Sequence, residues 1–339
     1  MSSNVTLKQI AEALGISAMT VSRVINNKKN VDEKTRKKVL EKARSMGYTP
    51  NYLAKSLVSN KSFTIGVVVP EISHSFFPEV IRGIEEVAYQ EDYQLILTHS
   101  AEDTEREKAA IETLRSKRVD GIMISCSQFT KDLSYFKELR SSGLPVVFFD
   151  RCLEDAGFSC VGVDDKAAAK RITQHLIDHG YTRIAHLKGA QGLSIGQRRL
   201  EGFREAMRDS DLKVDEEWIV ESGLQEKGGY EAMKKLLELP AEKRPRAVFA
   251  VNDPAAFGAI EAIREGGLTI PDDIAIVGFS DDIRAELLSV PLTTVQQPAY
   301  EVGKKAAETL LNIINGEYKS EENIQVLTKL KIRSSCGTH

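Results

Sequence analysis

Polar side chains that could bind a small molecule follow short apolar runs along the second part of the chain. An aspartate and an arginine follow the run that ends at 149, and similar polar groups follow the runs that end at 251 and 279. In open parallel sheets, ligands bind beyond the carboxyl ends of the strands. We therefore expect ligand contacts from these positions and from one arginine after a further run, namely Asp150, Arg151, Arg199, Asn252, Ser280 and Asp281.

The chemistry of this set favours a ligand rich in hydroxyl groups. Carboxylates accept and guanidinium groups donate hydrogen bonds in fixed directions that match the adjacent hydroxyls of a sugar. The arginines would also accommodate a carboxylate or a phosphate, so a sugar acid or a phosphorylated metabolite stays open. Polar residues at these strand ends could also have purely structural roles. Asp253 and Asp282 could cap helices, and Arg151 and Arg199 could pair with surface carboxylates.

Motifs for catalysis and metal binding are missing from the sequence. It has no glycine-lysine phosphate loop, no G-x-S-x-G elbow, and no zinc-like histidine cluster. Cys126, Cys152, Cys160 and Cys336 form no C-x-x-C pair and are interpreted as reduced thiols. We therefore expect a protein that is not an enzyme and has no cofactor or metal, with an enzyme and a solute-binding protein kept as alternatives.

The fold that positions the polar residues is predicted by apolar runs that alternate with amphipathic stretches from Phe63 onward. Runs such as TIGVVVP and VDGIMIS are typical of parallel strands buried on both faces. Their alternation with helices indicates a doubly wound α/β core. Two halves are expected, the first over 62–161 and the second over 162–291.

A second stretch able to do chemistry is TLKQIAEALGISAMTVSRVIN, residues 6–26, which predicts two short helices joined by a tight turn. Thr6 can cap the first helix and Gly15 ends it. Ser17 can cap the second helix, whose outward face would carry Arg23. Such a helix fits the major groove of DNA, where an arginine can bind guanine through two hydrogen bonds. Any amphipathic helical hairpin shows the same spacing, so the pattern alone leaves both interpretations open.

The distribution of charge favours DNA. Residues 1–61 have a net charge of +8, whereas the remainder has −11. A basic head on an acidic body indicates that the head binds a polyanion, although the lysine and arginine runs could also be a solvated helix surface.

Two further segments follow the helical hairpin. Residues 31–46 predict a third helix, which completes a small all-α head. The segment PNYLAKSLVSN, residues 50–60, is too short to stay helical alone, so we expect a hinge that orders when something packs against it. The third helix should bury Val31, Val39, Leu40, Ala43 and Met46.

This ordered series of motifs resembles the lactose/galactose-repressor (LacI/GalR) family of bacterial transcriptional regulators. The hairpin is followed by V-D-E-K-T-R-K-K-V and M-G-Y-T-P-N, and later by AVFAVND at 247–253, IPDDIAIVGF at 270–279 and PLTTVQQP at 291–298. The resemblance implies a ligand-responsive, sequence-specific DNA-binding repressor of carbohydrate-metabolism genes with a periplasmic-binding-protein-like core. Its implied division is a head over 1–49, a hinge helix over 50–61, one subdomain over 62–161 plus 292–335, and another over 162–291, with the effector cleft between the subdomains.

The resemblance also implies contact residues. Leu57 matches the leucine that the family wedges into the minor groove, with interdomain packing as the alternative. Lys55 stands where the family usually has arginine, which puts an arginine-specific phosphate contact in doubt. The implied DNA contacts are Thr6, Ser17, Ala18, Met19, Thr20, Ser22, Arg23, Asn26, Tyr48, Asn51, Ala54, Lys55 and Leu57. The implied effector contacts are Phe76, Phe77, Asp150, Arg151, Arg199, Leu224, Asn252, Ser280 and Asp281.

The last two of these positions depart from the family. Many members carry aspartate directly after a Gly-aromatic pair, whereas Ser280 follows Phe279 here. The effector contact is therefore expected at Ser280 or at Asp281.

The expected partners follow from this organisation. One head reads only half a site, which favours a homodimer on near-palindromic, double-stranded operator DNA. The small-molecule effector is expected to be a sugar, a sugar acid or a sugar phosphate. The sequence has no signal-peptide-like or membrane-spanning apolar stretch, so we expect a cytoplasmic protein with no membrane partner.

Overall fold

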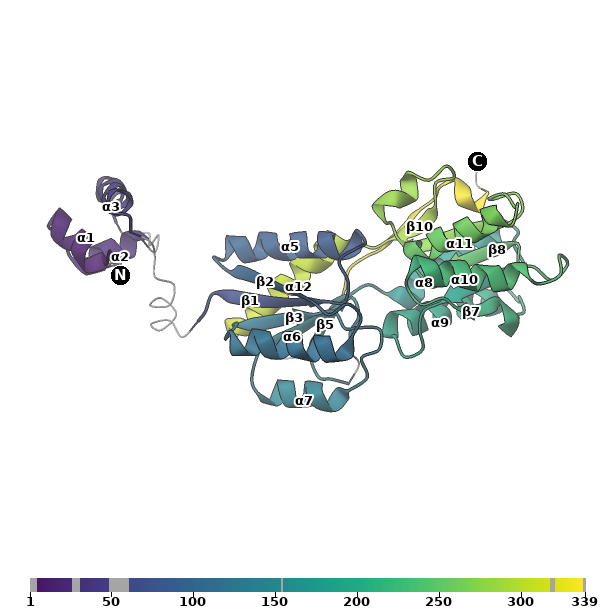
Figure 1. Ribbon diagram of the computed structural model, residues 1–339, viewed down its shortest axis with the longest axis horizontal. Coiled ribbons are helices and arrows are strands. Elements are labelled where there is room, and N and C mark those ends of the chain that lie inside the picture. Colours follow the sequence, from purple (N-terminus) through teal and green to yellow (C-terminus); the bar gives the residue numbers. More distant parts are fainter. Residues whose placement is uncertain (1–4, 26–30, 49–60, 154, 318–320, 338–339) are drawn as a thin grey trace. The chain divides into compact units, whose positions relative to one another are not determined.

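The computed structural model describes residues 5–25, 31–48, 61–153, 155–317 and 321–337 (Figure 1). The chain divides into two compact units, Met1–Ser62 and Phe63–His339, and we describe each by itself. The expected hinge over 50–60 lies outside the described residues, and so do the DNA contacts predicted at Asn26, Asn51, Ala54, Lys55 and Leu57.

The first unit is a three-helix head with a shared apolar core. Thr6 begins the first helix through a capping box, because its hydroxyl accepts from the Gln9 N–H at 3.3 Å and the Gln9 side chain accepts from the Thr6 N–H at 2.8 Å. Gly15 ends this helix with φ at +65°, a conformation that glycine adopts without steric cost. The helices are α1 (Leu7–Leu14), α2 (Ala18–Ile25) and α3 (Glu33–Ser45).

The third helix differs in one respect from its predicted core side. Asp32 caps it by accepting from the Thr35 N–H at 2.9 Å. Val39 and Ala43 are buried four residues apart on the inward side, whereas Leu40 is 47% exposed. The prediction that Leu40 belongs to the core is wrong, since it lies one residue outside the stripe that the two inward positions define. The buried residues of the head are Ile10, Ala11, Val21, Val24, Val39 and Ala43.

The second unit contains two subdomains, each built on a twisted sheet between helices (Figure 1). Among the described residues, the first sheet has the strand order β11-β5-β4-β3-β1-β2, and its strands are all parallel. Its strands are β1 (Thr64–Val69), β2 (Gln94–His99), β3 (Gly121–Ile124), β4 (Val146–Phe149), β5 (Ser159–Gly162) and β11 (Asn323–Gln325). Its helices are α5 (Phe76–Gln90), α6 (Thr104–Ser116), α7 (Leu133–Ser141) and α12 (Ala299–Ile314).

The second sheet has the order β12-β10-β9-β8-β6-β7, parallel except for its edge strand β12. Its strands are β6 (Ile184–Lys188), β7 (Ile219–Glu221), β8 (Ala247–Ala250), β9 (Ala275–Ser280), β10 (Thr293–Gln296) and β12 (Lys329–Lys331). Its helices are α8 (Asp165–Asp178), α9 (Ser194–Asp209), α10 (Glu226–Leu237) and α11 (Asp253–Glu265), with the short 3-10 segments η1 (Glu216–Trp218), η2 (Ile283–Glu286) and η3 (Ser334–Cys336). The predicted pair of doubly wound subdomains is confirmed.

The boundary between the subdomains differs from the expected one. We expected the whole of 292–335 to return to the first subdomain, but β10 pairs with β9, and β12 pairs with β10, in the second sheet. Of the described helices and strands that follow β10, only α12 and β11 return to the first subdomain. The β-branched stretch at 292–296 fits a strand in either sheet, so its pairing could not be derived from the residues alone.

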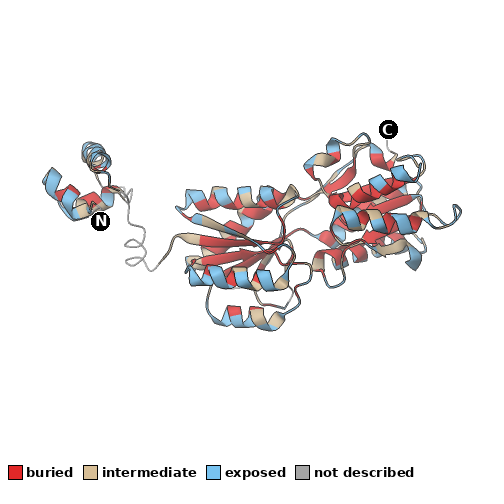
Figure 2. Cartoon of the chain, in the orientation of Figure 1, coloured by how far each residue is buried: buried red, intermediate tan, exposed pale blue. Residues whose placement is uncertain are grey.

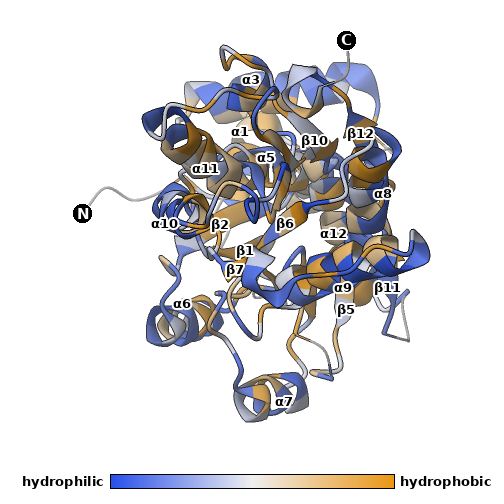
Figure 3. Cartoon of the chain, turned by 90° about the vertical axis from the view of Figure 1, so that its right-hand side faces the viewer, coloured by the Kyte–Doolittle hydropathy of each residue, from blue (hydrophilic) through white to orange (hydrophobic). Residues whose placement is uncertain are grey.

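Burial follows this layered plan. The inner strands are buried over most of their length, and the helices expose their outer sides (Figure 2). Helix α7 shows hydrophilic and hydrophobic residues on different sides, as expected for a helix packed on a sheet (Figure 3). Glycines permit close contacts between helices, since a Cβ atom at Gly83 of α5 would lie only 2.1 Å from the Tyr300 carbonyl oxygen of α12. Within the described residues, no helix is long and apolar enough to cross a membrane.

Two of the cysteines are joined. Cys152 follows β4 and Cys160 lies in the neighbouring strand β5, and they form a disulfide with their Cα atoms 6.0 Å apart. The interpretation of all four cysteines as reduced thiols is therefore wrong for this pair, since adjacent parallel strands bring the two residues together. Cys126 and Cys336 are buried and do not take part in this disulfide.

Candidate functional site

The outward face of α2 is the candidate DNA-binding surface of the head. Ala18, Met19 and Arg23 are exposed on it, and 66% of the Met19 surface is accessible to solvent. Ser17 lies at the helix start, and its hydroxyl accepts from the Thr20 N–H at 3.1 Å. An apolar side chain on an exposed helix face beside a basic one is suited to contact with bases and phosphates.

The other described residues predicted to contact DNA have structural roles in addition. Thr6 is exposed and caps α1, and Thr20 and Ser22 are half-buried. Tyr48 packs partly against the core of the head, and burial raises the pKa of its hydroxyl. Contact of these residues with DNA stays a prediction.

A cleft in the second unit brings together the carboxyl ends of strands from both sheets. The loop after β1 and the end of β4 contribute from the first subdomain, and α9 and the loops after β7, β8 and β9 contribute from the second. It encloses a cavity of about 50 Å³. The predicted effector residues that line it are Phe76, Phe77, Asp150, Arg151, Arg199, Leu224, Asn252 and Ser280. Sequence reasoning missed Glu71, His74, Ile195, Gln225, Pro254, Asp282 and Gln297 as lining residues.

Aromatic rings form one wall of the cleft. Phe76 and Phe77 begin α5, and their rings meet edge to face with centroids 5.2 Å apart. Phe77 is buried and packs against Phe149 at the end of β4, whereas Phe76 is half-buried. An apolar wall of this kind can cover one face of a ring-shaped ligand.

Asp150 places a carboxylate at the base of the cleft. Its backbone has φ at +57°, a conformation that aspartate tolerates better than most residues. Oδ1 accepts from Gln297 Nε2 at 3.2 Å, and Oδ2 lies 3.9 Å from Arg151 Nε. Burial raises the pKa of this carboxyl group, although Arg151 and Arg199 act to lower it. Asp150 therefore keeps acceptor capacity for hydroxyl donors.

The two arginines of the cleft are held by carboxylates of the protein, the half-buried Glu102 and the buried Asp165. Arg151 Nη1 donates to Glu102 Oε1 at 2.6 Å, and Arg199 Nε donates to Asp165 Oδ1 at 2.8 Å. Arg199 is only 1% exposed, and its guanidinium also donates to the Val251 carbonyl oxygen at 2.7 Å. Pairing with carboxylates, the alternative considered for both arginines, is what the structure shows, but with interior rather than surface partners.

Asn252 both lines the cleft and caps a helix. Its Oδ1 accepts from the Ala255 N–H at the start of α11, and its Nδ2 donates to the Leu224 carbonyl oxygen, each at 2.9 Å. Leu224 is buried beside it. Asn252, and not Asp253, is therefore the cap of α11, since Asp253 already lies inside the helix.

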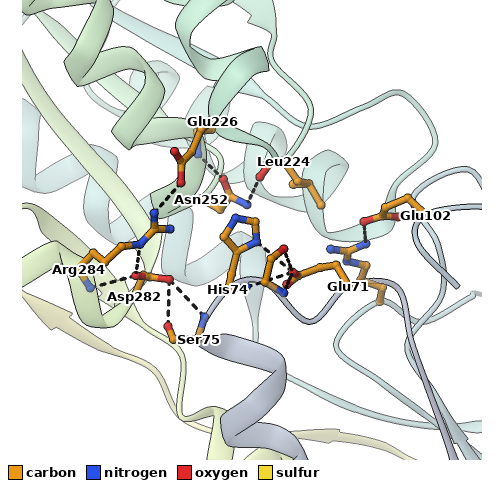
Figure 4. A network of polar contacts seen from close by, with 12 residues as sticks. Glu71, His74, Ser75, Glu102, Leu224, Glu226, Asn252, Asp282 and Arg284 are labelled. Carbon is orange, nitrogen blue, oxygen red and sulfur yellow. Dashed lines mark hydrogen bonds and ion pairs between the residues drawn. The ribbon is translucent and has the colours of Figure 1, made fainter. Parts of the chain in front are cut away.

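A polar network joins the two subdomains across the edge of the cleft (Figure 4). Ser75, at the start of α5, donates its hydroxyl to Asp282 Oδ2 at 3.0 Å. Arg284 donates to Asp282 Oδ1 at 3.0 Å and to Glu226 Oε1 at 2.6 Å. On the first subdomain, Glu71 accepts from the N–H of Ser73 at 2.8 Å and lies 3.1 Å from His74 Nδ1. This network ties the position of α5 to that of the second subdomain.

Asp281 is the predicted effector residue that the structure does not bring into the cleft. It is held by Arg333, whose Nη2 donates to Oδ1 at 2.8 Å, and by Gln296, whose Nε2 donates to Oδ2 at 3.0 Å. Left-handed backbone at 280 and 281 turns the chain so that Asp282, one residue later, faces the cleft. Of the two positions left open after Phe279, Ser280 lines the cleft.

A wider groove of about 640 Å³ opens beside the cleft. It shares Asp150 and Ile195 with the cleft, and its other walls come from the loops around the disulfide, from residues near β11, and from side chains of α7, α8 and α9. It lacks the aromatic wall formed by Phe76 and Phe77. We therefore take the cleft as the candidate ligand site.

Behind the cleft, Asp253 is a fully buried carboxyl group. It accepts from Thr294 Oγ1 at 2.6 Å and from the Asp282 N–H at 2.7 Å. Burial raises its pKa to about 7, since desolvation outweighs these two hydrogen bonds. The folded protein therefore retains a proton on Asp253 at pH values where the unfolded chain, with an aspartate pKa of about 4, has lost it.

Asp253→Asn should reduce the pH dependence of stability. Between about pH 5 and 8 the folded state binds more protons than the unfolded state, so the free energy of unfolding falls as pH rises. We expect this fall to be about 2 kcal/mol smaller in Asp253→Asn than in the parent, as measured by urea denaturation at both pH values. The exposed Asp211→Asn should behave like the parent. Equal falls in the parent and Asp253→Asn would show that Asp253 titrates normally.

A helix-turn-helix head together with a core of two α/β subdomains around a ligand cleft defines a class of proteins, the ligand-binding transcription regulators. Residues 6–51 match the model of the bacterial regulatory proteins of the lacI family. Residues 62–334 match the model of periplasmic binding proteins and the sugar binding domain of the LacI family. The chain belongs to the LacI family of bacterial regulatory proteins, as its motifs predicted.

Relatives and solved structures agree with this assignment over nearly the whole chain. The HTH-type transcriptional repressor PurR of Vibrio campbellii is 35% identical over 330 residues, which cover 97% of this chain and 98% of the relative. The Lac repressor dimer bound to operator and an anti-inducer matches with a TM-score of 0.85 at 25% identity, over 98% of this chain and 99% of that one. The transcriptional regulator CelR in complex with cellobiose matches with a TM-score of 0.73 at 28% identity, over 98% of this chain and 100% of that one. The chain is accordingly a helix-turn-helix transcription regulator of a family that is not enzymatic.

Proposed function

We propose that this protein is a sugar-responsive repressor of carbohydrate-metabolism genes, in which a sugar bound in the cleft alters the affinity of the head for operator DNA. The observation that carries the proposal is the cleft itself. It combines the aromatic wall of Phe76 and Phe77 with the carboxylate of Asp150, which has acceptor capacity left for hydroxyl groups. Apolar cover for a ring face and fixed polar groups for its hydroxyls are the two requirements of sugar binding.

The similar proteins support a carbohydrate ligand. The CelR structure contains cellobiose. The family model that covers the core is itself described as a sugar binding domain. The cleft residues Phe76, Phe77, Asp150, Leu224 and Asn252 are the proposed contacts with the sugar.

The head and the segment after it supply the DNA-binding part of the proposal. We infer a homodimer on near-palindromic DNA, like the Lac repressor dimer bound to its operator, because two heads are needed to read two half-sites. In this division, residues 1–49 form the head, 50–61 form a hinge that orders on DNA, and Leu57 is its wedge in the minor groove. Such a protein acts in the cytoplasm, where the chromosome is accessible.

Coupling between the cleft and the head follows from linkage. A ligand shifts the arrangement of the two subdomains only as far as it binds one arrangement better than the other. The bond between Ser75 and Asp282 spans the two subdomains, so it is one contact through which sugar can select an arrangement. By reciprocity, operator DNA must change sugar affinity by the same factor.

A thermal-shift screen of the full chain tests the ligand class. A ligand that binds only the folded state raises the melting temperature, and the stabilisation grows with the logarithm of its concentration relative to its dissociation constant. The proposal expects stabilisation by a sugar and none by purine bases. Stabilisation by purines without any response to sugars would contradict it.

Arg23→Ala tests the reading face of the head. The side chain is exposed on α2, and loss of a base-reading arginine should cost about 1 to 3 kcal/mol of operator affinity and relax preference at one position per half-site. Affinity should be measured by fluorescence anisotropy with operator variants selected from a random DNA library. Arg44→Ala, an exposed arginine on α3, is the matched control and should weaken all sequences equally. Unchanged base preference in Arg23→Ala would show that Arg23 contacts the phosphate backbone and does not read bases.

A further inference from the structure

Arg151, the arginine at the end of β4, has its charge offset inside the protein. Its Nη1 donates to Glu102 Oε1 at 2.6 Å, and the two side chains are 6% and 14% exposed. Glu102 is held in place in turn, because its Oε2 accepts from the Gln128 N–H at 2.8 Å. The Arg151 guanidinium also lies over the Phe77 ring, 5.5 Å from its centroid. Arg151 is therefore fixed as half of a neutral pair.

Arg199 is held in the same way from the second subdomain. Its Nε lies 2.8 Å and its Nη2 lies 2.7 Å from Asp165 Oδ1, and its Nη1 donates to the Val251 carbonyl oxygen. Its guanidinium stacks on Phe279 at 3.7 Å from the ring centroid. The Asp165 carboxylate offsets the charge of Arg199, and contacts with Asp165 and with the Val251 carbonyl oxygen occupy two edges of the guanidinium group.

Arg151 keeps donor capacity that could serve a ligand. Its Nε is buried without a hydrogen-bond partner among the described residues, whereas Arg199 Nη2 lies 2.7 Å from Asp165 Oδ1. Recognition of a carboxylate or a phosphate by arginine uses two parallel N–H donors and an uncompensated charge. An N–H donor whose charge is already neutralised within the fold is suited instead to a hydroxyl oxygen.

Carboxylates dominate the remaining charge of the cleft. Glu71, Asp150 and Asp282 all line it, and Asp282 shares Arg284 with Glu226 (Figure 4). Burial acts to raise the pKa of Glu71, but hydrogen bonds from His74 and Ser73 outweigh it and leave the pKa lowered, so this group is ionised at neutral pH. An anionic ligand would lie close to these carboxylates in a site that screens charge poorly.

We propose that the cleft selects neutral, hydroxyl-rich ligands over anionic sugar acids and sugar phosphates, and that Glu102 is a specificity-determining residue that enforces this choice by neutralising Arg151. The inference rests on the proposed sugar-responsive function and narrows its ligand class. It argues against binding of an anionic ligand by the two arginines, because Glu102 and Asp165 already neutralise them.

Glu102→Gln is the variant that tests the proposal. The amide keeps an oxygen to accept from the Gln128 N–H but removes the negative charge beside Arg151, which then regains an uncompensated charge in the cleft. Glu112→Gln is the matched control, because Glu112 pairs with Arg115 on α6 and does not line the cleft. The full-length parent and both variants would be melted with neutral sugars, D-glucose, D-galactose and cellobiose, and with D-glucuronate, D-galacturonate and glucose 6-phosphate. Inorganic phosphate at the same concentration controls for anions bound at the basic head.

The proposal expects the parent and Glu112→Gln to be stabilised by at least one neutral sugar and not by anionic ones beyond the phosphate control. It expects Glu102→Gln to bind anionic sugars about tenfold more tightly than the parent does. Stronger stabilisation of the parent by an anionic sugar than by its neutral counterpart would overturn it, as would a folded Glu102→Gln with no gain for anions. If Glu102→Gln does not fold, as judged by circular dichroism, the proposal is judged by whether the parent prefers neutral or anionic sugars. A parent that responds to no sugar of either charge would contradict the proposed function itself, and this inference with it.

Discussion

Replacing Arg199 with alanine is expected to lower the free energy of unfolding by about 3 to 5 kcal/mol at neutral pH, because it leaves a buried carboxylate without its partner. Asp165 and Arg199 are nearly inaccessible to solvent, and burial raises the pKa of Asp165 to about 6 even with the arginine in place. Without Arg199, the Asp165 pKa should rise further. The loss of stability should therefore be larger at pH 8, where Asp165 must ionise, than at pH 5, where it can stay protonated.

Chemical denaturation followed by circular dichroism measures this effect at both pH values. Arg204→Ala is a suitable control, because Arg204 pairs with Glu216 at the exposed surface, where an ion pair contributes about 1 kcal/mol or less. An Arg199→Ala protein as stable as the parent that has lost only sugar binding would show that the arginine serves the ligand alone. The structure predicts instead that Arg199 contributes more to the stability of the fold than to sugar binding.

Replacing Asp150 with asparagine is expected to weaken sugar binding by about 2 kcal/mol or more, roughly thirtyfold, while operator affinity without sugar stays unchanged. Asparagine tolerates the left-handed backbone at this position, so the variant should fold. It removes the charge that strengthens hydrogen bonds from ligand hydroxyls. Isothermal titration calorimetry with the sugar that stabilises the parent most would measure the loss.

Asp155→Asn is the matched control for Asp150. Asp155 also has left-handed backbone, with φ at +60°, but it lines the wider groove and not the cleft. Sugar binding should persist in Asp155→Asn. Loss of binding in Asp155→Asn with normal binding in Asp150→Asn would move the ligand site from the cleft to the groove.

The fold was predictable where local patterns determine it. The capping residues Thr6 and Ser17, the turn at Gly15 and the apolar stripe of α1 give the helix-turn-helix, and the buried runs give the strands. Pairing between distant strands is a different matter. Strand β10 suits either sheet by composition, and its place beside β9 depends on long-range contacts that periodicity does not encode.

The candidate site was predictable in position more than in detail. The rule that ligands bind at the carboxyl ends of parallel strands located Asp150, Asn252 and Ser280. It could not show that Glu102 and Asp165 hold the two arginines, since each partner lies 34 or more residues away along the chain. Nor could it separate Asp281 from Asp282, because a reversal of the backbone at 280–281 decides which carboxylate faces the cleft. The Cys152–Cys160 disulfide likewise follows from neighbouring strands and not from a spacing motif.

The measurement that tests the central claim most directly is the affinity of the full-length protein for its selected operator with and without saturating sugar. Anisotropy titrations at constant salt would be run on the parent and on Asp150→Asn, with sugar binding to the parent verified by its melting temperature. The proposed function predicts that sugar changes the operator affinity of the parent by about 5- to 150-fold and leaves that of Asp150→Asn nearly constant at the same concentration. Equal operator affinity of the parent with and without a sugar that is shown to be bound would contradict the proposal that the cleft controls the head.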